Sequence, residues 1–251
     1  MSLEERYKSE KSKWDEIARK RAGHLEILPP DEDFHQYARD NSELPGISEF
    51  FGNLEGKRLL ELGCGAGKMA VLLAKSGAEV TAFDLSPVSA QTARELAALN
   101  NTTIDLTVAS GENLPFANGS FDIIFGKSIL HHLIIDLGRH DIYSVLKKGG
   151  RAVFVEPLGM NPVLTFVRKY VPYRHKHPVG VDQPLTYKDI QAWTKEFRSV
   201  KIREVELLSM VERAFGWDTK FILLRKLDKF LLKYIPFLRR FCRYVVIYTN
   251  K

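Results

Sequence analysis

The stretch Glu61-Leu-Gly-Cys-Gly-Ala-Gly67 decides the fold, because it places a glycine-rich turn directly after a short apolar strand predicted at 58–62. Glycines let a backbone adopt positive φ and approach a ligand closely. The helix predicted from Met69 points its N-terminal N–H groups into the same space. Such a turn is typical of many nucleotide-binding folds and is also compatible with a purely structural role. Lys68 occupies the place of the third glycine of a dinucleotide fold, which argues against NAD(P) and FAD.

Strands and helices alternate at short spacing around this turn, from residue 57 to residue 156. A helix is predicted at Pro87–Leu99 with Ser86 as its N-cap, and another at 133–146, ended by Gly149 and Gly150. Alternation of this kind is typical of βαβ units and predicts an α/β fold with a doubly wound, mostly parallel sheet. Its further strands are expected at 79–83, 104–108, 121–125, 151–155, 201–207 and 244–248.

The basic excess of the chain is local. The 251 residues carry a net charge of +6, but residues 220–243 alone carry +7, which leaves −1 for the remainder. The two cysteines, Cys64 and Cys242, exclude a disulfide framework and a Cys-rich zinc module, and they favour a reducing compartment. The charged N-terminus has no apolar region typical of a secretory signal, and no apolar run is long enough to predict a membrane-spanning helix.

Asp84 closes the second predicted strand, 21 residues after Gly63. A carboxylate at this place can accept hydrogen bonds from both ribose hydroxyls of an adenosine. Alternatively, it is an acid near a helix N-terminus that the helix dipole stabilises. The sequence therefore indicates an adenosine-containing ligand with little or no pyrophosphate, without excluding the structural role.

Six short motifs in a fixed order carry a resemblance to a known family over roughly residues 55–156. The chain resembles the class I S-adenosylmethionine-dependent methyltransferases. This resemblance implies a seven-stranded Rossmann-like sheet with helical cap insertions, and S-adenosyl-L-methionine as the cofactor. The motifs are Leu59-Leu-Glu-Leu-Gly-Cys-Gly-Ala-Gly67, Val80-Thr-Ala-Phe-Asp-Leu-Ser86, Gly111-Glu-Asn-Leu-Pro-Phe116, Ser120-Phe-Asp-Ile-Ile124, Leu130-His-His-Leu133 and Leu146-Lys-Lys-Gly-Gly150.

The resemblance also implies a set of cofactor contacts. Glu61 is expected to orient the amino-acid end of the cofactor, Asp84 to hold the ribose, and Leu85 to lie against the adenine. Ser110 stands where many relatives have an aspartate, so adenine recognition is expected to depend more on backbone groups nearby. The full expected set is Glu61, Gly63, Cys64, Gly65, Gly67, Asp84, Leu85, Ser86, Ser110, Gly111, Glu112 and Lys127.

Candidate catalytic residues follow the fourth and fifth predicted strands, which end at the same edge of the sheet. Methyl transfer from a sulfonium depends mostly on orientation, and a general base is needed only where the acceptor must lose a proton. We expect His131 to pair with Glu156 as that base, with His132 as the other choice. Each histidine is equally compatible with a helix cap or a core position, and Glu156 with a substrate-positioning or structural carboxylate.

The segments outside the core are expected to cover the site. Residues 1–251 are predicted to form a single domain, with an N-terminal helical cover at 1–54, a cofactor-binding core at 55–156, and cap or lid insertions at 157–185 and 208–243. Tyr170, Tyr173, Arg174 and His175 are expected to contact an acceptor. A metal at His175 and His177 is disfavoured by their basic neighbours, so no metal site is predicted.

The basic segment 219–243 has two interpretations. Leu224, Leu227, Leu231 and Tyr234 share one helical face, which is typical of a cap helix packed on the domain. The same pattern, with Lys226 and its neighbours on another face, is compatible with peripheral contact to an anionic membrane. Nucleic-acid binding is not favoured, because no RNA-binding module is visible.

The function predicted from the sequence is S-adenosylmethionine-dependent O-, C- or N-methylation of a small or lipid-like acceptor. The expected location is the cytoplasm, with the inner face of a membrane as a second possibility. Two alternatives remain: a non-catalytic adaptor with the same fold, and an RNA or protein methyltransferase. The sequence does not identify the acceptor or the oligomeric state.

Overall fold

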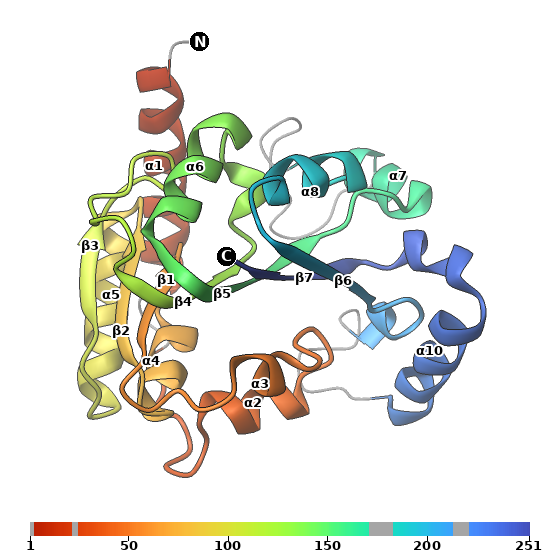
Figure 1. The fold of residues 1–251 in the computed structure, drawn as a ribbon, viewed down its shortest axis with the longest axis horizontal. Helices are drawn as coiled ribbons and strands as arrows, with labels where there is room; N and C mark the ends of the chain where they lie inside the picture. The colour runs from red at the N-terminus through yellow and green to blue at the C-terminus, as the bar shows by residue number, and fades with distance from the viewer. Residues whose placement is uncertain (1–2, 22–24, 171–182, 213–220) are drawn as a thin grey trace.

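The strands form one sheet in the part of the chain that the computed structural model describes, residues 3–21, 25–170, 183–212 and 221–251 (Figure 1). The sheet is seven-stranded, in the order β3-β2-β1-β4-β5-β7-β6. Only β7 runs antiparallel to its neighbours, β5 and β6, so the predicted fold class is confirmed. The strands are β1 (Arg58–Leu62), β2 (Glu79–Asp84), β3 (Asp105–Val108), β4 (Phe121–Lys127), β5 (Leu146–Pro157), β6 (Ser199–Val205) and β7 (Tyr244–Asn250).

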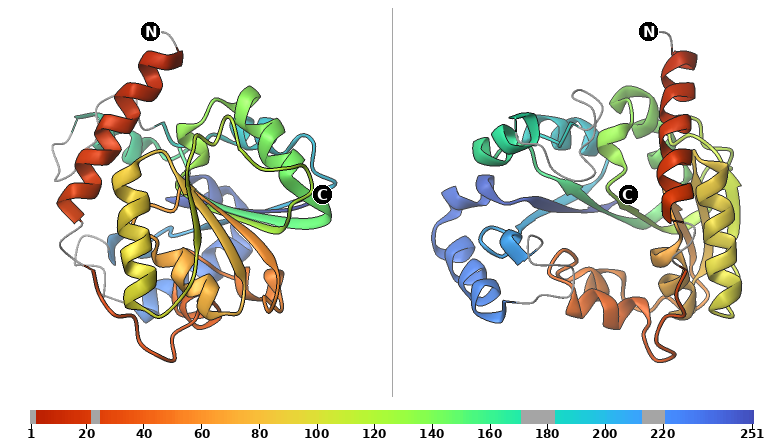
Figure 2. Two further views of the ribbon diagram at one scale, coloured as in Figure 1. Left: turned by 90° about the vertical axis from the view of Figure 1, so that its left-hand side faces the viewer. Right: turned by 180° about the vertical axis from the view of Figure 1, so that it is seen from behind.

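Helices cover both faces of the sheet (Figures 1 and 2). No described helix is long and apolar enough to cross a membrane. The α-helices are α1 (Leu3–Arg21), α2 (Phe34–Asp40), α3 (Ile47–Phe51), α4 (Lys68–Lys75), α5 (Pro87–Leu99), α6 (Ile135–Val145), α7 (Pro162–Tyr170), α8 (Tyr187–Thr194) and α10 (Ile222–Tyr234). Short 3-10 helices are η1 (Leu130–His132), η2 (Ser209–Val211) and η3 (Pro236–Phe241).

Two apolar cores lie on the two faces of the sheet. Leu59 belongs to the core shared with α2, α3, α4 and α5, and the next residue, Leu60, belongs to the core shared with α6 and α8. Both leucines are fully buried. A parallel strand that is covered on both faces has a nearly continuous apolar sequence. This explains why apolar and polar residues do not alternate regularly in the 58–62 segment.

The N-cap predicted at Ser86 is confirmed, and the structure contains a second capped helix start at Thr186. The Ser86 hydroxyl accepts the N–H of Ser89 at the start of α5, at 3.0 Å. Thr186 and Asp189 form a capping box at the start of α8. Each cap satisfies N–H groups that have no partner within the helix.

Two boundary predictions are wrong. Gly149 and Gly150 do not end a helix, because α6 ends at Val145 and both glycines lie inside β5, where Gly149 has a φ of 78°. The basic segment 219–243, whose leucine pattern predicts one helix, is divided: α10 ends at Tyr234, and Pro236 begins the separate helix η3. Proline lacks the N–H that a continuing helix would need.

Candidate functional site

The glycine turn between β1 and α4 lies at the edge where the parallel strands end. Gly63, Gly65 and Gly67 all have positive φ, between 53° and 86°. The Asp84 carboxylate accepts the N–H of Gly65 through Oδ2 and the N–H of Ser86 through Oδ1, each at 2.9 Å. Asp84 therefore fixes both the turn and the start of α5. The Ser89 side chain also hydrogen-bonds this carboxylate, which has about four acceptor positions, so capacity for a ligand hydroxyl remains.

Gly67 is required at its position for two reasons. Its φ is +86°, and a Cβ there would lie 2.6 Å from the Cβ of Ala93 in α5. We expect Gly67→Ala to lower the free energy of unfolding by about 2 to 4 kcal/mol, through left-handed strain and overpacking together. Gly119→Ala is the matched control, because Gly119 has a φ of +64° and a Cβ there would meet nothing within 4 Å. Urea unfolding of both variants checks this, and equal losses would contradict a steric role for Gly67.

Glu61 brings a buried carboxyl group to the same turn. Its side chain is 3% exposed, and its Oε2 atom has no hydrogen-bond partner among the described residues. Burial, with a smaller contribution from Asp84, raises the pKa of Glu61 to about 8. A buried carboxyl group with one oxygen lacking a hydrogen bond favours a cationic group beside it, since an opposite charge would offset its desolvation.

A histidine–carboxylate pair follows β4 and β5 at this edge. The fully buried Glu156 accepts the N–H groups of Ile129 and Leu130 through Oε1, at 2.9 and 2.8 Å. Its Oε2 lies 2.6 Å from Nδ1 of His131. The contact predicted between these residues is therefore present. Because a carboxylate only accepts, Nδ1 carries the proton and Nε2 is the basic nitrogen of the ring.

His132 has different surroundings. Its ring lies edge-on to Trp14 of α1, with the centroids 5.2 Å apart, and its centroid is 4.0 Å from that of His131. The two adjacent histidines are therefore distinguished by structure: Glu156 orients His131, whereas His132 contacts the N-terminal helix. The catalytic role of either residue stays a prediction.

Helix α1 packs along α5 and contacts the site residues (Figure 2). Arg6 donates to Glu112 at 3.3 Å and to the carbonyl of His132, and Asp15 accepts from the Ser86 hydroxyl. Glu112 is buried and also accepts the N–H of Ile134. Ser110 lies beside it, with its hydroxyl 3.3 Å from the carboxylate. These contacts connect α1 to the segments on which the cofactor contacts are expected.

Lys127 ends β4 on the face that also carries Glu61, and it forms an ion pair with Glu43. Burial lowers the pKa of Lys127, but the Glu43 carboxylate more than offsets this, so the net shift is upward. Glu206 lies nearby, 3.8 Å from Arg243, and burial raises its pKa to about 7. Glu43, Glu206 and Arg243 were not among the predicted site residues, since no local motif marks an ion pair between distant segments.

The predicted acceptor contacts are only partly described. Tyr170 lies at the end of α7 and is exposed. Tyr173, Arg174 and His175 lie outside the described residues, as does His177 of the disfavoured metal alternative. No group of three or more metal-ligating side chains occurs within the described ranges.

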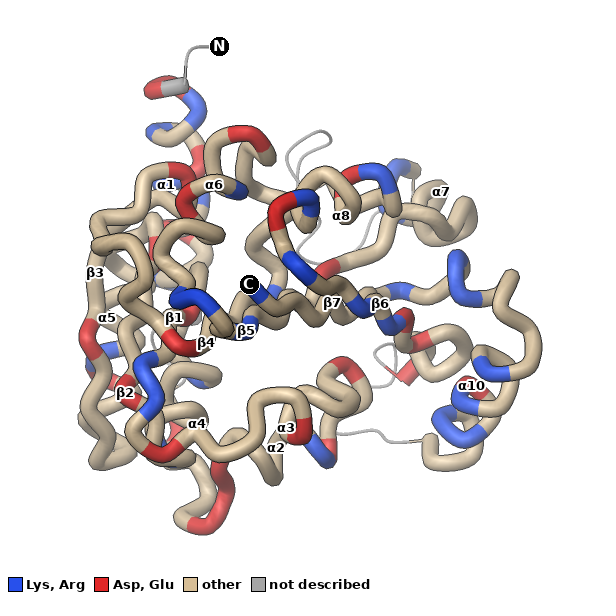
Figure 3. Tube along the Cα trace, viewed as in Figure 1, with Lys and Arg blue, Asp and Glu red and all other residues tan. Residues whose placement is uncertain are grey.

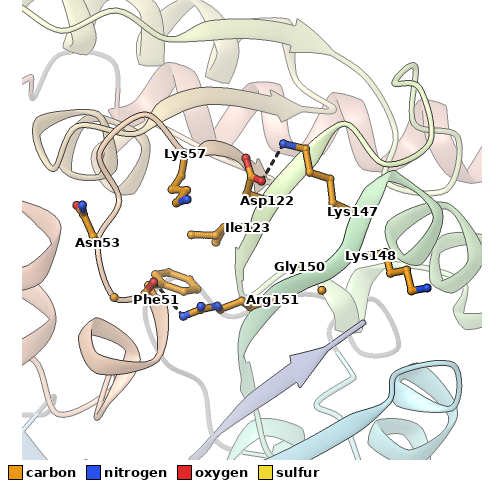
Figure 4. A pocket seen from close by; sticks show the side chains of 11 residues that line it. Phe51, Asn53, Lys57, Asp122, Ile123, Lys147, Lys148, Gly150 and Arg151 are labelled. Carbon is orange, nitrogen blue, oxygen red and sulfur yellow. Dashed lines mark hydrogen bonds and ion pairs between the residues drawn. The ribbon is translucent and has the colours of Figure 1, made fainter.

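A separate pocket opens at the opposite edge of the sheet, where β1, β4 and β5 begin (Figure 4). Lys57, Asp122, Lys147 and Arg151 line it, and Lys147 pairs with Asp122 at 2.8 Å. Because the sheet separates this pocket from His131 and Glu156, it does not belong to the candidate site.

Comparison with known proteins agrees with this geometry. A family model described as a methyltransferase domain matches residues 60–154, which run from β1 to β5 and include the glycine turn, Asp84 and both histidines. This match covers 95 of the 251 residues and agrees with the resemblance to the class I S-adenosylmethionine-dependent methyltransferases. Within this methyltransferase domain, the residues that resemble the family's cofactor motifs meet at one edge of the sheet.

Two similar relatives are ubiquinone biosynthesis O-methyltransferases. The protein of Bordetella parapertussis is 32% identical over 117 residues, which cover 46% of this chain and 48% of the relative. The protein of Methylocella silvestris is 34% identical over 105 residues, which cover 42% of this chain and 41% of the relative. The matches thus span less than half the length of these relatives.

Solved structures of methyltransferases share the fold over a larger part of the chain. An S-adenosylmethionine-dependent methyltransferase from Mesorhizobium loti has a TM-score of 0.54 at 18% identity and covers 85% of this chain and 100% of its own. Geranyl diphosphate C-methyltransferase from Streptomyces coelicolor has a TM-score of 0.56 at 16% identity. The match covers 94% of this chain and 78% of that structure's chain. At these identities the likeness shows the fold.

Proposed function

We propose that this methyltransferase transfers the methyl group of S-adenosyl-L-methionine to an oxygen of a small lipophilic acceptor, such as a phenol that carries an apolar tail. The observation that carries the proposal is the His131–Glu156 pair at the same sheet edge as the glycine turn and Asp84. The relatives named for ubiquinone biosynthesis support an oxygen as the acceptor atom.

The residues at this edge fit the cofactor. Asp84 would accept the ribose hydroxyls, and Glu61 would face the cationic amino-acid end, which accounts for its buried carboxyl oxygen without a hydrogen bond. Bound there, S-adenosylmethionine supplies a methyl group activated by the positive charge of its sulfonium. The open space at Gly65, where a Cβ would meet nothing within 4 Å, leaves room for a ligand above the turn.

The chain's own contribution is then orientation and proton transfer. His131 would take the hydroxyl proton of the acceptor at Nε2 as the acceptor oxygen attacks the methyl carbon in line with the departing sulfur. Glu156, which already accepts two backbone N–H groups, holds the ring and stabilises the imidazolium that forms. The proton leaves afterwards to solvent.

A transfer assay with methyl-labelled cofactor tests this proposal. The acceptors to compare are a prenylated catechol, its fully O-methylated counterpart, and a tailless catechol. We expect labelled product from the prenylated catechol and none from the blocked compound. Transfer to none of a panel of phenols, together with intact cofactor binding, would contradict O-methylation and favour the carbon, nitrogen or adaptor alternatives.

Glu61 makes cofactor binding dependent on pH. Its pKa of about 8 means that the Glu61 carboxyl group is mostly protonated at pH 7 when no ligand is bound. A bound cation lowers that pKa, so binding releases a proton, and affinity rises from pH 6 to pH 8 by at most about tenfold per unit. Calorimetry in two buffers of different ionisation enthalpy measures the proton count. We expect Glu61→Gln to abolish the release; an unchanged release would assign the proton to another group.

A lipid-soluble acceptor also gives a reason for the membrane contact considered for the basic segment. Such a compound partitions into a bilayer, so an enzyme that uses it gains from proximity to the lipid surface.

A further inference from the structure

Helix α10 exposes apolar side chains, two of which the sequence pattern assigned to packing on the domain. Leu223 is 77% exposed, Phe230 is 58% exposed, and Leu227 and Tyr234 are also exposed. At 100° per residue these four lie within one narrow arc of the helix. Ile235 and Phe237 extend the exposed apolar surface into η3. We call these six residues and the cations between them the α10–η3 face.

The orientation of α10 has an identifiable cause. Asp228, the one buried residue of the helix, accepts the N–H groups of Leu207, Leu208 and Ser209 and the Ser209 hydroxyl, at 2.7 to 3.1 Å. Arg225, close to Asp228 on the helix, forms a bidentate contact with Glu212, in which Nε donates to Oε1 and Nη2 donates to Oε2. These polar anchors turn the side of α10 that carries Arg225 and Asp228 toward the domain, so that the apolar arc, on the opposite side of the helix, points outward.

The charge around this apolar arc is positive throughout. Lys226, Lys229, Lys233, Arg239 and Arg240 are all exposed, and the only acidic residue between 221 and 241 is the buried Asp228. Figure 3 shows basic positions in blue along α10. Lys226, Lys229 and Lys233 share the arc next to the apolar one. A helix with a lysine-rich side and exposed leucine and aromatic residues is typical of one that lies in a membrane interface.

Helix α7 lies at the same end of the molecule as α10 (Figures 1 and 2) and carries a second apolar stripe. Val163, Phe166 and Tyr170 are exposed on it. The Asn161 side chain, just before α7, donates to the carbonyl of Phe241 at 2.7 Å and so connects α7 to η3. The exposed apolar surface is therefore larger than one helix provides.

We propose that the α10–η3 face binds the surface of an anionic lipid bilayer, with its apolar arc in the headgroup–acyl boundary and its lysines and arginines on the lipid phosphates. Charge complementarity favours lipid over a second copy of the chain, because two such faces would repel each other. The face follows β6 and precedes β7 at the edge where β5 ends in Glu156 and Pro157, so a bound protein would hold that edge near the bilayer. That membrane binding would bring the enzyme close to a lipid-soluble acceptor rests on the proposed function. The binding of the α10–η3 face to lipid does not rest on it.

Vesicle sedimentation with the full chain tests the proposal. At low salt we expect retention on vesicles of phosphatidylcholine with phosphatidylglycerol, little retention on phosphatidylcholine alone, and loss of retention as salt rises. A triple variant with Lys226→Glu, Lys229→Glu and Lys233→Glu reverses three charges. We expect it to bind anionic vesicles at least about tenfold more weakly than the wild type. The matched control reverses Lys57, Lys148 and Lys201, three exposed lysines outside this face.

A second pair of variants tests the apolar arc. Leu223→Ser with Phe230→Ser is expected to weaken binding to anionic vesicles at moderate salt, whereas Ile27→Ser with Leu99→Ser, at exposed apolar positions elsewhere, is not. Cofactor binding should be unchanged in all of these variants, which separates this result from failure of the proposed function. Three results would overturn the proposal. The wild-type protein does not sediment with anionic vesicles, or the control variants lose as much vesicle binding as the test variants. The third is that the wild-type protein forms dimers and that Leu223→Ser with Phe230→Ser abolishes them.

Discussion

Replacing His131 with alanine is expected to lower kcat for O-methylation by about 10²- to 10⁴-fold, the range of a positioned general base. The reason is that His131 is the histidine whose ring is oriented by a buried carboxylate, with Nδ1 2.6 Å from Glu156. Cofactor affinity should change little, because the expected ribose and methionine contacts come from other segments. Steady-state kinetics with a prenylated catechol, beside a cofactor titration, separates the two effects.

His132→Ala is the matched control for this prediction. The His132 ring contacts Trp14 and is not oriented by Glu156, so we expect kcat of this variant to fall less than about tenfold. Glu156→Gln keeps an acceptor for the N–H groups of Ile129 and Leu130 but removes the charge beside His131. It should lower kcat and move the acidic limb of the pH profile of kcat/KM to lower pH, because the imidazolium loses its counter-ion. Normal turnover by His131→Ala would contradict the base assignment.

Asp84→Ala is expected to raise the Kd for S-adenosylmethionine by about 10²-fold or more, since hydrogen bonds to a charged group contribute about 1.5 to 3 kcal/mol each. The same variant also loses the acceptor for the N–H groups of Gly65 and Ser86. Asp84→Asn keeps much of that shape without the charge and should give an intermediate loss. Calorimetric titration of each variant measures the change.

Asp105→Ala provides the control for Asp84. Asp105 is exposed and begins β3, at the opposite edge of the sheet. Its removal should leave cofactor affinity unchanged while altering the net charge by the same amount. Unchanged affinity in both Asp84→Ala and Asp84→Asn would place the ribose elsewhere.

Features encoded by neighbouring residues were predictable from the sequence. The turn at Gly63–Gly67, the N-cap at Ser86 and the capping box at Thr186 depend on local patterns, and the structure contains each of them. The His131–Glu156 contact was predictable because parallel strands end at a common edge, which brings residues after β4 and at the end of β5 together.

Features that depend on distant segments were not predictable. Nothing near Lys127 in sequence indicates Glu43 as its partner. The leucine pattern of α10 suggested that Leu227 and Tyr234 pack inward with Leu224 and Leu231, but Leu227 and Tyr234 are exposed. The buried N–H groups of residues 207–209 need an acceptor, and Asp228 supplies it. This tertiary requirement, absent from the helical pattern, sets the rotation of α10.

The most direct test of the central claim is calorimetric titration of the wild-type chain with S-adenosylhomocysteine, the demethylated product. It binds through the same amino-acid, ribose and adenine groups, and it requires no knowledge of the acceptor. We predict a micromolar Kd, one site per chain and proton release near pH 7. No binding at millimolar ligand would contradict the assignment of the Gly63–Gly67 turn, Glu61 and Asp84 as a cofactor site.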